Sequence, residues 1–353
     1  MEKKKMTKKG NKSARFLGLR RNWWVTGVVL ALLFAGAVWC LGVLGNKYEY
    51  EDTRVYIPGN ATVETVRDSL IGSLGKEIGG DVFLVWNCRG GKVPVSEGSY
   101  AIKTGMTVYD ISRKILNGRQ DPVKVVFNNV RTLGQLADKV ASKMEFDASA
   151  FSRACDSVLA SKGLTPEQRP AAFLPDTYEF YWNASPESVV ERLAGYHDKF
   201  WNEERRRKAD ALGLTPVEVA TVASIVEEET AKADERPKVA RLYLNRIRKG
   251  MKLQADPTVK FAVGDFALRR ILGTHLKVES PYNTYLHEGL PPGPIRVVDK
   301  RTLDAVLDAP AHDYVYMCAK EDFSGYHNFA VTFAEHQANA DRYRRELNRR
   351  GIR

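Results

Sequence analysis

The longest uninterrupted hydrophobic pattern in the chain lies close to its N-terminus. Residues 23–44 contain no charged side chain across twenty-two positions, which is long enough to cross a bilayer as a helix. Trp23 and Trp24 stand at the start of this run, and amphipathic rings favour the membrane–water interface. The pattern therefore predicts a single transmembrane helix over 23–44.

Positive charge is concentrated directly before that helix. Residues 1–22 hold nine lysines and arginines and one glutamate, within a formal net charge of +11 for the whole chain. Because basic residues before a span stay in the cytoplasm, residues 1–22 are predicted to be a cytoplasmic tail of a single-pass protein of the inner (plasma) membrane. The rest would be periplasmic or extracytoplasmic. A cleaved signal peptide is the alternative, but the apolar run continues to Leu44. The uneven charge gives no case for a nucleic-acid partner.

Short strand patterns alternate with short helical patterns over residues 50–130, which predicts a small α+β module there. Within it, residues 98–115 read as a strand, a turn and a capped helix. The positions that define this pattern are Tyr100, Ile102, Gly105, Thr107, Val108 and Ile111. The segment resembles half of a LysM motif, and LysM domains bind glycans that contain N-acetylglucosamine. An ordinary strand–turn–helix with the same pattern is the alternative.

Helical patterns dominate the rest of the chain. Residues 131–200 read as a helical connecting region that is interrupted at 173–182. A helix is predicted over 215–232, another ends at Gly250, and a loop-rich stretch follows over 251–300. The chain as a whole is therefore assigned to the α+β class.

Three consecutive glutamates end the helix predicted over 215–232. Successive residues turn by about 100° around a helix, and the apolar positions among residues 219–226 define its buried face. Glu229 falls in the middle of that face, and Glu227 falls at its edge. Glu228 falls on the opposite face, which is polar. The pattern singles out Glu229 as the carboxylate directed inward.

An inward carboxylate at this place favours acid–base chemistry. Partial burial disfavours its charged form and raises its pKa, which is what a general acid needs near neutral pH. The alternative is a helix-end glutamate paired with Lys232 or Arg236. The polar face that carries Glu228 also holds Thr221 and Ser224.

Polar and aromatic segments follow this helix and suit a carbohydrate ligand. Sugar hydroxyls need hydrogen-bonding partners and sugar faces stack on aromatic rings. The candidates for substrate binding are Gln254, Asp256, Asn283, Tyr285 and His327. Two of them have alternative interpretations, Asp256 as a cap of the turn before Pro257 and His327 as a core histidine.

Five segments together resemble one protein family. They read FLPDTYEF, TVASIVEEET, YLNRIRKGMKLQADPTV, YNTYLHEGLPPGPI and HNFAVTFAEH. In content and order they resemble the endolytic murein transglycosylases, the MltG or YceG-like family, over roughly residues 50–345. The resemblance implies a mixed α/β catalytic domain over 201–345 that contains a lysozyme-like, glutamate-bearing helix.

The resemblance also implies an activity. Members of this family are anchored in the inner membrane and cut nascent peptidoglycan strands internally, between N-acetylmuramic acid and N-acetylglucosamine. It assigns catalysis to Glu229, the second glutamate of the Glu-x-Glu-Thr motif at 227–230, and a supporting place to Glu227. Glu228 stands where relatives often carry lysine and is predicted to face outward, so that change should matter little.

The implied mechanism needs one carboxyl group. Glu229 would protonate the glycosidic oxygen and then take the proton of the same sugar's C6 hydroxyl, which closes on C1. Strand elongation would end at a 1,6-anhydromuramoyl residue, and tethering of the nucleophile favours this route. No cofactor or metal is expected, because the histidines form no H-E-x-x-H motif and the cysteines no C-x-x-C motif. Peptidoglycan synthases of the elongation or division machinery are the partners that the resemblance implies.

Two alternatives from other classes remain open at the level of sequence. One is a membrane-anchored, non-catalytic glycan-binding scaffold, which would have no need of an inward Glu229. The other is a muramidase with two carboxylates, for which Asp256 would supply the second.

Overall fold

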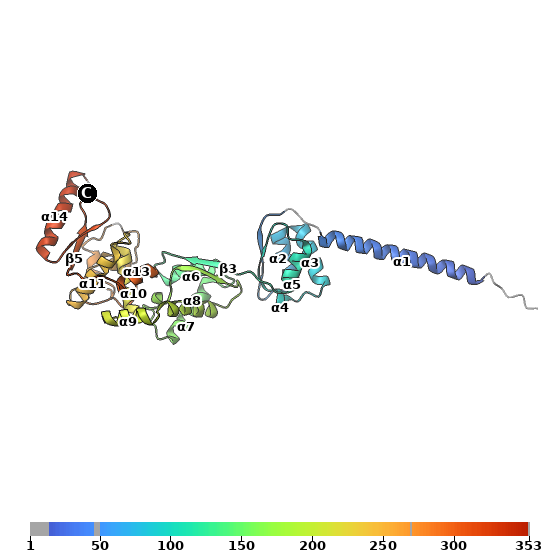
Figure 1. The fold of residues 1–353 in the computed structure, drawn as a ribbon, viewed down its shortest axis with the longest axis horizontal. Coiled ribbons are helices and arrows are strands. Elements are labelled where there is room, and N and C mark those ends of the chain that lie inside the picture. Colours follow the sequence, from blue (N-terminus) through green and yellow to red (C-terminus); the bar gives the residue numbers. More distant parts are fainter. Residues whose placement is uncertain (1–13, 46–49, 269, 352–353) are drawn as a thin grey trace, which may run out of the picture. The chain divides into compact units, whose positions relative to one another are not determined.

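The computed structural model describes residues 14–45, 50–268 and 270–351. Its internal contacts divide the chain into two compact units, Met1–Asp121 and Pro122–Arg353 (Figure 1). Its strands form three two-stranded antiparallel pairs within the described residues. Together with the helices, they confirm the predicted α+β class.

The first unit begins with a long apolar helix, α1 (Ala14–Gly45). Its stretch Trp23–Gly45 is 23 residues long and apolar enough to cross a membrane. This agrees with the predicted span at 23–44, and the side of the membrane that each end faces stays a prediction. The first thirteen residues of the basic tail predicted over 1–22 lie outside the described residues.

A small module follows α1. Its elements are β1 (Thr53–Ile57), α2 (Val63–Leu74), α3 (Lys76–Cys88), α4 (Val93–Ser96), β2 (Gly98–Ile102) and α5 (Val108–Leu116). The strands pair antiparallel, with Val55 opposite Tyr100. The expected strand–turn–helix is present, because Gly105 turns with a φ of 84° and Thr107 caps α5 in a capping box with Asp110. Glycan binding by this segment stays a prediction.

The second unit opens with a strand pair covered by helices. Its elements are β3 (Val123–Phe127), α6 (Leu133–Ala141), α7 (Ala148–Ser161), η1 (Arg169–Ala172), β4 (Asp176–Phe180) and α8 (Pro186–Phe200). The sequence pattern grouped 123–127 with the small module, whereas the structure pairs β3 with β4, Val125 opposite Tyr178. The division of the chain therefore falls at Asp121, before the boundary drawn at residue 130. A local pattern cannot reveal a strand partner so distant in sequence.

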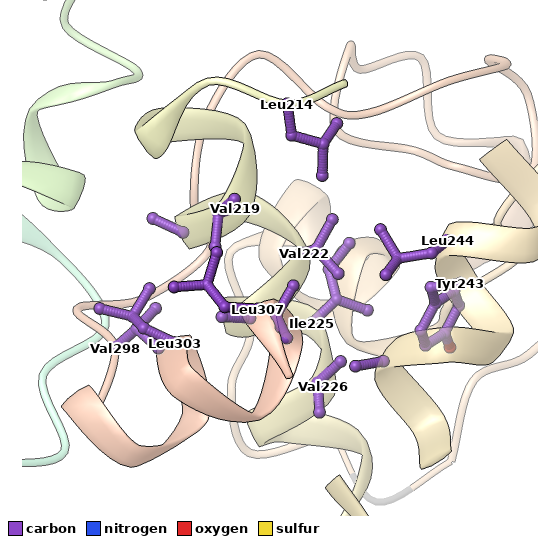
Figure 2. Close-up of a cluster of buried hydrophobic side chains, with 14 of the residues drawn as sticks. Leu214, Val219, Val222, Ile225, Val226, Tyr243, Leu244, Val298, Leu303 and Leu307 are labelled. Atoms are coloured by element: carbon purple, nitrogen blue, oxygen red, sulfur yellow. The ribbon is translucent and has the colours of Figure 1, made fainter. Parts of the chain in front are cut away.

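The remaining elements include one central helix, α10. They are α9 (Glu203–Leu212), α10 (Pro216–Glu229), α11 (Arg236–Arg248), α12 (Asp256–Val263), η2 (His275–Lys277), α13 (Lys300–Leu307), β5 (Tyr316–Ala319), β6 (His327–Ala330) and α14 (Phe333–Arg349). Helix α10 contacts α9, α11, α12 and α13. Figure 2 shows its side chains Val219, Val222, Ile225 and Val226 in the shared core.

Helix α10 is buried on every side, which differs from the predicted polar face. Thr221 and Ser224 are 1% and 0% exposed. The Thr221 hydroxyl donates to the Val217 carbonyl, and Ser224 Oγ donates to the Thr221 carbonyl and accepts from the Ile295 amide. Small hydroxyl side chains can line a core when their hydrogen bonds are satisfied locally. Helix position alone therefore did not predict their burial.

Candidate active site

A cavity of about 240 Å³ opens at the C-terminal end of α10. It lies among α10, α11, the start of α12 and the β5–β6 hairpin. Its lining residues are Glu229, Leu242, Tyr243, Arg246, Gln254, Asp256, Tyr285, Met317, Cys318, Ala319 and His327. Five residues expected at a site (Glu229, Gln254, Asp256, Tyr285 and His327) are therefore brought together, although they come from four separate segments of the chain.

Glu229 is the last residue of α10, and its side chain reaches the cavity. Its Oε1 accepts a hydrogen bond of 2.7 Å from the Tyr243 hydroxyl. The two cations considered as partners are engaged elsewhere, since Lys232 lies over the Tyr326 ring and Arg236 donates to the Thr302 hydroxyl. The alternative of a helix-end ion pair with either cation is therefore not what the structure contains.

Burial raises the pKa of Glu229 to about 7. The hydrogen bond from Tyr243 lowers this pKa, and the negative charge of Asp256 raises it. Electrostatic interactions with His327 and Arg246 lower this pKa by smaller amounts. A carboxyl group with this pKa gives up and takes back a proton near neutral pH, as a group that acts first as acid and then as base requires.

Asp256 and Tyr285 form a second pair in the cavity wall. Asp256 is the first residue of α12, and its Oδ1 accepts a hydrogen bond of 2.7 Å from the Tyr285 hydroxyl. Burial and this carboxylate raise the pKa of Tyr285, so its hydroxyl stays protonated. Gln254 precedes α12 and has a φ of 48°. Its backbone N–H donates a hydrogen bond to the Thr284 carbonyl. The Asp256 carboxylate is thus held by a tyrosine from another loop.

Asn283 does not line the cavity, in contrast to the expectation that it binds substrate. It is 0% exposed, and its Nδ2 donates to the carbonyls of Leu276 and Val278. Its Oδ1 accepts from the Tyr285 amide. An amide with its donors and acceptor engaged in this way shapes the loop that presents Tyr285.

The other two glutamates of the triplet face a different set of partners. Glu227 Oε1 lies 3.1 Å from Arg296, and its Oε2 accepts from the Asp299 amide and the Thr302 hydroxyl. The structure therefore places Glu227 against α13, and none of these bonds reaches Glu229. The printed partners of Glu227 thus lie away from Glu229, and its supporting role beside Glu229 stays a prediction.

The prediction that Glu228 faces solvent is wrong. Its side chain is only 16% exposed and pairs with Arg131 at 2.9 Å and with Arg296 at 2.6 Å. Because α10 is enclosed by other elements, its polar edge meets arginines from the loop after β3 and the segment before α13. Helix periodicity gave the direction of Glu228 but not what lies there.

Sequence reasoning did not identify two residues of the cavity, Tyr243 and Arg246. Both lie on α11, three positions apart, and both are buried. Arg246 Nε donates to the Val315 carbonyl and its Nη1 to the Leu253 carbonyl. The available signal was a tyrosine and an arginine among the mostly apolar buried residues of that helix.

His327 begins β6 and is held from behind. Its Nδ1 lies 2.8 Å from Glu235 Oε2, and its side chain is 16% exposed. It is therefore part of the cavity wall, and the interpretation as a core histidine does not hold. Among the described residues, no group of three or more His, Cys, Asp or Glu side chains is arranged to hold a metal ion.

The chain is similar in sequence to one family of known proteins. The YceG-like family model matches residues 55–342. This chain belongs to the YceG-like family. Over 156 residues it is 34% identical to an endolytic murein transglycosylase of Bacillus subtilis, which covers 44% of this chain and 41% of that protein. Over 339 residues it is 25% identical to one of Streptococcus pneumoniae serotype 2, which covers 83% of this chain and 60% of that protein.

The YceG-like fold is also found in a solved structure. A crystal structure of a YceG-like protein from Listeria monocytogenes superimposes with a TM-score of 0.55 at 24% identity. The match covers 82% of this chain and 98% of that one. The chain spans about 40 to 60% of the length of the curated relatives it matches.

Proposed function

We propose that this protein is an endolytic lytic transglycosylase that cleaves peptidoglycan strands between N-acetylmuramic acid and N-acetylglucosamine. The observation that carries the proposal is Glu229, a carboxyl group with a pKa of about 7 in the wall of a polar cavity. The names of the curated relatives and the family match support the same reaction.

The first half of the reaction uses Glu229 as an acid. Tyr243 donates to Oε1, so the proton of the neutral carboxyl group resides on Oε2. That proton passes to the glycosidic oxygen while the bond from C1 of the muramoyl residue breaks. The N-acetylglucosamine residue leaves with a free 4-hydroxyl group, and an oxocarbenium-like centre develops at C1. The Asp256 carboxylate supplies negative charge to this cavity and favours such a cation.

The second half uses the same carboxyl group as a base. The Glu229 carboxylate removes the proton of the C6 hydroxyl on the muramoyl residue, and O6 bonds to C1. Glu229 regains its proton, no water is consumed, and the strand ends in a 1,6-anhydromuramoyl residue. Tyr243 remains a donor throughout, because burial raises its pKa well above the ordinary value.

Gln254, Asp256, Tyr285 and His327 surround the space in which the two sugars would lie. We assign them to the binding of hydroxyl and acetamido groups, since hydrogen-bonding and aromatic side chains of this kind match such ligands. The long apolar helix α1 would anchor the enzyme in the plasma membrane, with residues 45–353 outside the cytoplasm. The small module would bind glycan as LysM domains do, and synthases of the cell wall would be partners.

Product analysis tests the proposal directly. The full chain in detergent micelles and its Glu229→Gln variant are incubated with uncrosslinked peptidoglycan strands, and the fragments are analysed by mass spectrometry. Internal cuts with anhydromuramic ends, one water lighter than reducing ends, are expected from the wild type only. Reducing ends would instead indicate the two-carboxylate muramidase, with Asp256 as its second acid. Strands that bind but stay uncut would support the glycan-binding scaffold.

A further inference from the structure

A second buried carboxylate, Glu235, lies behind the cavity and takes no part in the mechanism above. Its side chain is 5% exposed, and it stands at the residue before α11. Its Oε2 accepts a hydrogen bond from the Thr230 hydroxyl at 3.1 Å and lies 2.8 Å from His327 Nδ1, and its Oε1 accepts from the His327 backbone amide at 2.8 Å. Two of these three contacts are with His327.

These hydrogen bonds to Glu235 fix the orientation of the His327 ring. Both carboxylate oxygens accept hydrogen bonds, so the proton between Glu235 and the imidazole resides on Nδ1. Nε2 lies on the opposite side of the ring, and the ring lines the cavity. In the neutral imidazole, Nε2 is then an acceptor. The arrangement presents one hydrogen-bond acceptor to a ligand from a defined direction.

The same carboxylate is tied to the helix end that carries Glu229. Thr230 follows Glu229 directly, donates its hydroxyl proton to Glu235 and accepts a hydrogen bond from the Lys232 amide at 3.0 Å. Glu235 therefore connects the end of α10 with the start of β6. Through these hydrogen bonds, Glu235 is linked to both His327 and the residue that follows Glu229.

The energetic balance points to a role beyond packing. Taking a carboxylate out of water costs several kcal/mol unless it is well paired, and a neutral side chain would join the same segments at less cost. Within the described part of the chain, the side chains that hydrogen-bond to Glu235 are those of Thr230 and His327. The other charged groups of the cavity are Glu229 of α10, Arg246 of α11 and Asp256 of α12.

We propose that Glu235 is a positioning residue that sets the Nδ1–H tautomer of His327, so that His327 Nε2 accepts a hydrogen bond from a sugar hydroxyl beside Glu229. This inference rests on the proposed function and adds to it the residue that orients the glycan. It predicts that the charge of Glu235, and not only its shape, matters for turnover.

The test compares Glu235→Gln and His327→Ala with the wild type, each as the full chain in detergent micelles. The introduced glutamine keeps the size of the side chain. Its single oxygen is needed by the His327 backbone amide, so its NH₂ group donates to Nδ1 and reverses the tautomer. Losing a hydrogen bond of this kind lowers kcat/KM by roughly 10- to 100-fold, and we expect that loss in both variants. Added imidazole should restore part of the activity of His327→Ala.

Nitrogen NMR of ¹⁵N-histidine-labelled protein supplies a readout that a merely structural role would not move. In the wild type, the His327 signals should show a protonated Nδ1 and an unprotonated Nε2, and Glu235→Gln should exchange the two. The matched controls are Asp198→Asn and His197→Ala. His197 is likewise 16% exposed and lies 3.2 Å from Asp198, but on α8, so turnover should stay within about twofold.

The outcomes separate this inference from the proposed function. If the wild type forms anhydromuramic ends and Glu235→Gln retains its kcat/KM to within about twofold, the positioning role is overturned and the enzyme assignment stands. An unchanged His327 tautomer in Glu235→Gln would also overturn it. If the wild type cuts nothing, the function fails. The roles of Glu235 and His327 are then tested by the affinity of the protein for peptidoglycan strands. This affinity should fall in Glu235→Gln if His327 binds sugar, and an unchanged affinity would overturn the inference.

Discussion

The two sides of the C-terminal end of α10 place glutamate side chains in contrasting environments. On one side, Glu227 and Glu228 meet Arg296 and Arg131 and are held as ion pairs. On the other side, Glu229 accepts a hydrogen bond from a tyrosine hydroxyl and lines a cavity, and its pKa rises to about 7. Of three adjacent glutamates, Glu227 and Glu228 therefore form ion pairs between elements, and Glu229 is an acid with a raised pKa. The difference lies in their partners from distant segments.

The arginine side and the cavity side of this helix end are also expected to differ in what they support, stability on one side and activity on the other. A carboxylate paired with arginine joins neighbouring elements, whereas a desolvated carboxyl group weakens the fold once it ionises. We therefore expect changes on the arginine side to affect unfolding and changes on the cavity side to affect turnover and its pH dependence.

The largest effect is expected from Glu229→Gln. The amide cannot donate or accept the proton of the reaction, so the rate of anhydromuramic-end formation should fall by roughly 10²- to 10⁴-fold. The measurement is the rate of fragment release from uncrosslinked strands. Strand affinity and the melting temperature should not fall. A variant with near wild-type turnover would move the acid role elsewhere, with Asp256 first in line.

Removing the central arginine of the opposite side should act on stability. Arg296→Met leaves Glu227 buried without its counter-charge, and breaking a buried pair of this kind lowers the free energy of unfolding by about 3–5 kcal/mol. Chemical denaturation of the full chain in micelles measures the change. Arg301→Met is the matched control, because Arg301 is 86% exposed and pairs with Asp299 at the surface, so its effect should be small. Equal effects in the two variants would remove the distinction between the two sides.

The pH dependence of stability should carry the signature of Glu229. Its pKa in the folded state lies above the ordinary carboxyl value of 4.5, so the folded protein binds more protons than the unfolded chain between these two pKa values. Stability is then fully present below pH 4.5 and falls as the pH rises to about 7, by roughly 2–3 kcal/mol. Glu229→Gln should lack this component, and its stability relative to the wild type should grow over that range. Parallel curves for the two proteins would contradict the raised pKa.

The smallest effects should come from the two residues that adjust the Glu229 pKa in opposite directions. Tyr243→Phe removes a hydrogen bond that lowers this pKa, and Asp256→Asn removes a charge that raises it. The alkaline decline of kcat should therefore move to higher pH in the first variant and to lower pH in the second. The measurement is the pH–rate profile of each variant. Shifts of the same sign in the two variants would contradict the assignment of the alkaline decline to Glu229.

The sequence predicted most of the residues that line the site, but it did not predict which elements pack around them. Periodicity placed Glu229 on the inner face, and the polar motifs supplied Gln254, Asp256, Tyr285 and His327, all of which line the cavity. The arginine partners of Glu228 could not be inferred, since a helical pattern contains no information about elements that enclose its polar edge. Asn283 was misplaced for the same reason, because its bonds to a neighbouring loop depend on how that loop folds back.

Some properties of this protein follow from its sequence alone. The uncharged stretch 23–44, the capping residue Thr107 and the inward direction of Glu229 depend on local geometry, which neighbours along the chain determine. The tertiary structure alone decided that β3 pairs with β4, that Glu228 is an ion-pair partner and that Glu235 stands behind the cavity. These depend on contacts between segments far apart in sequence, and the pKa of Glu229 is set by desolvation, which exists only when those segments have come together.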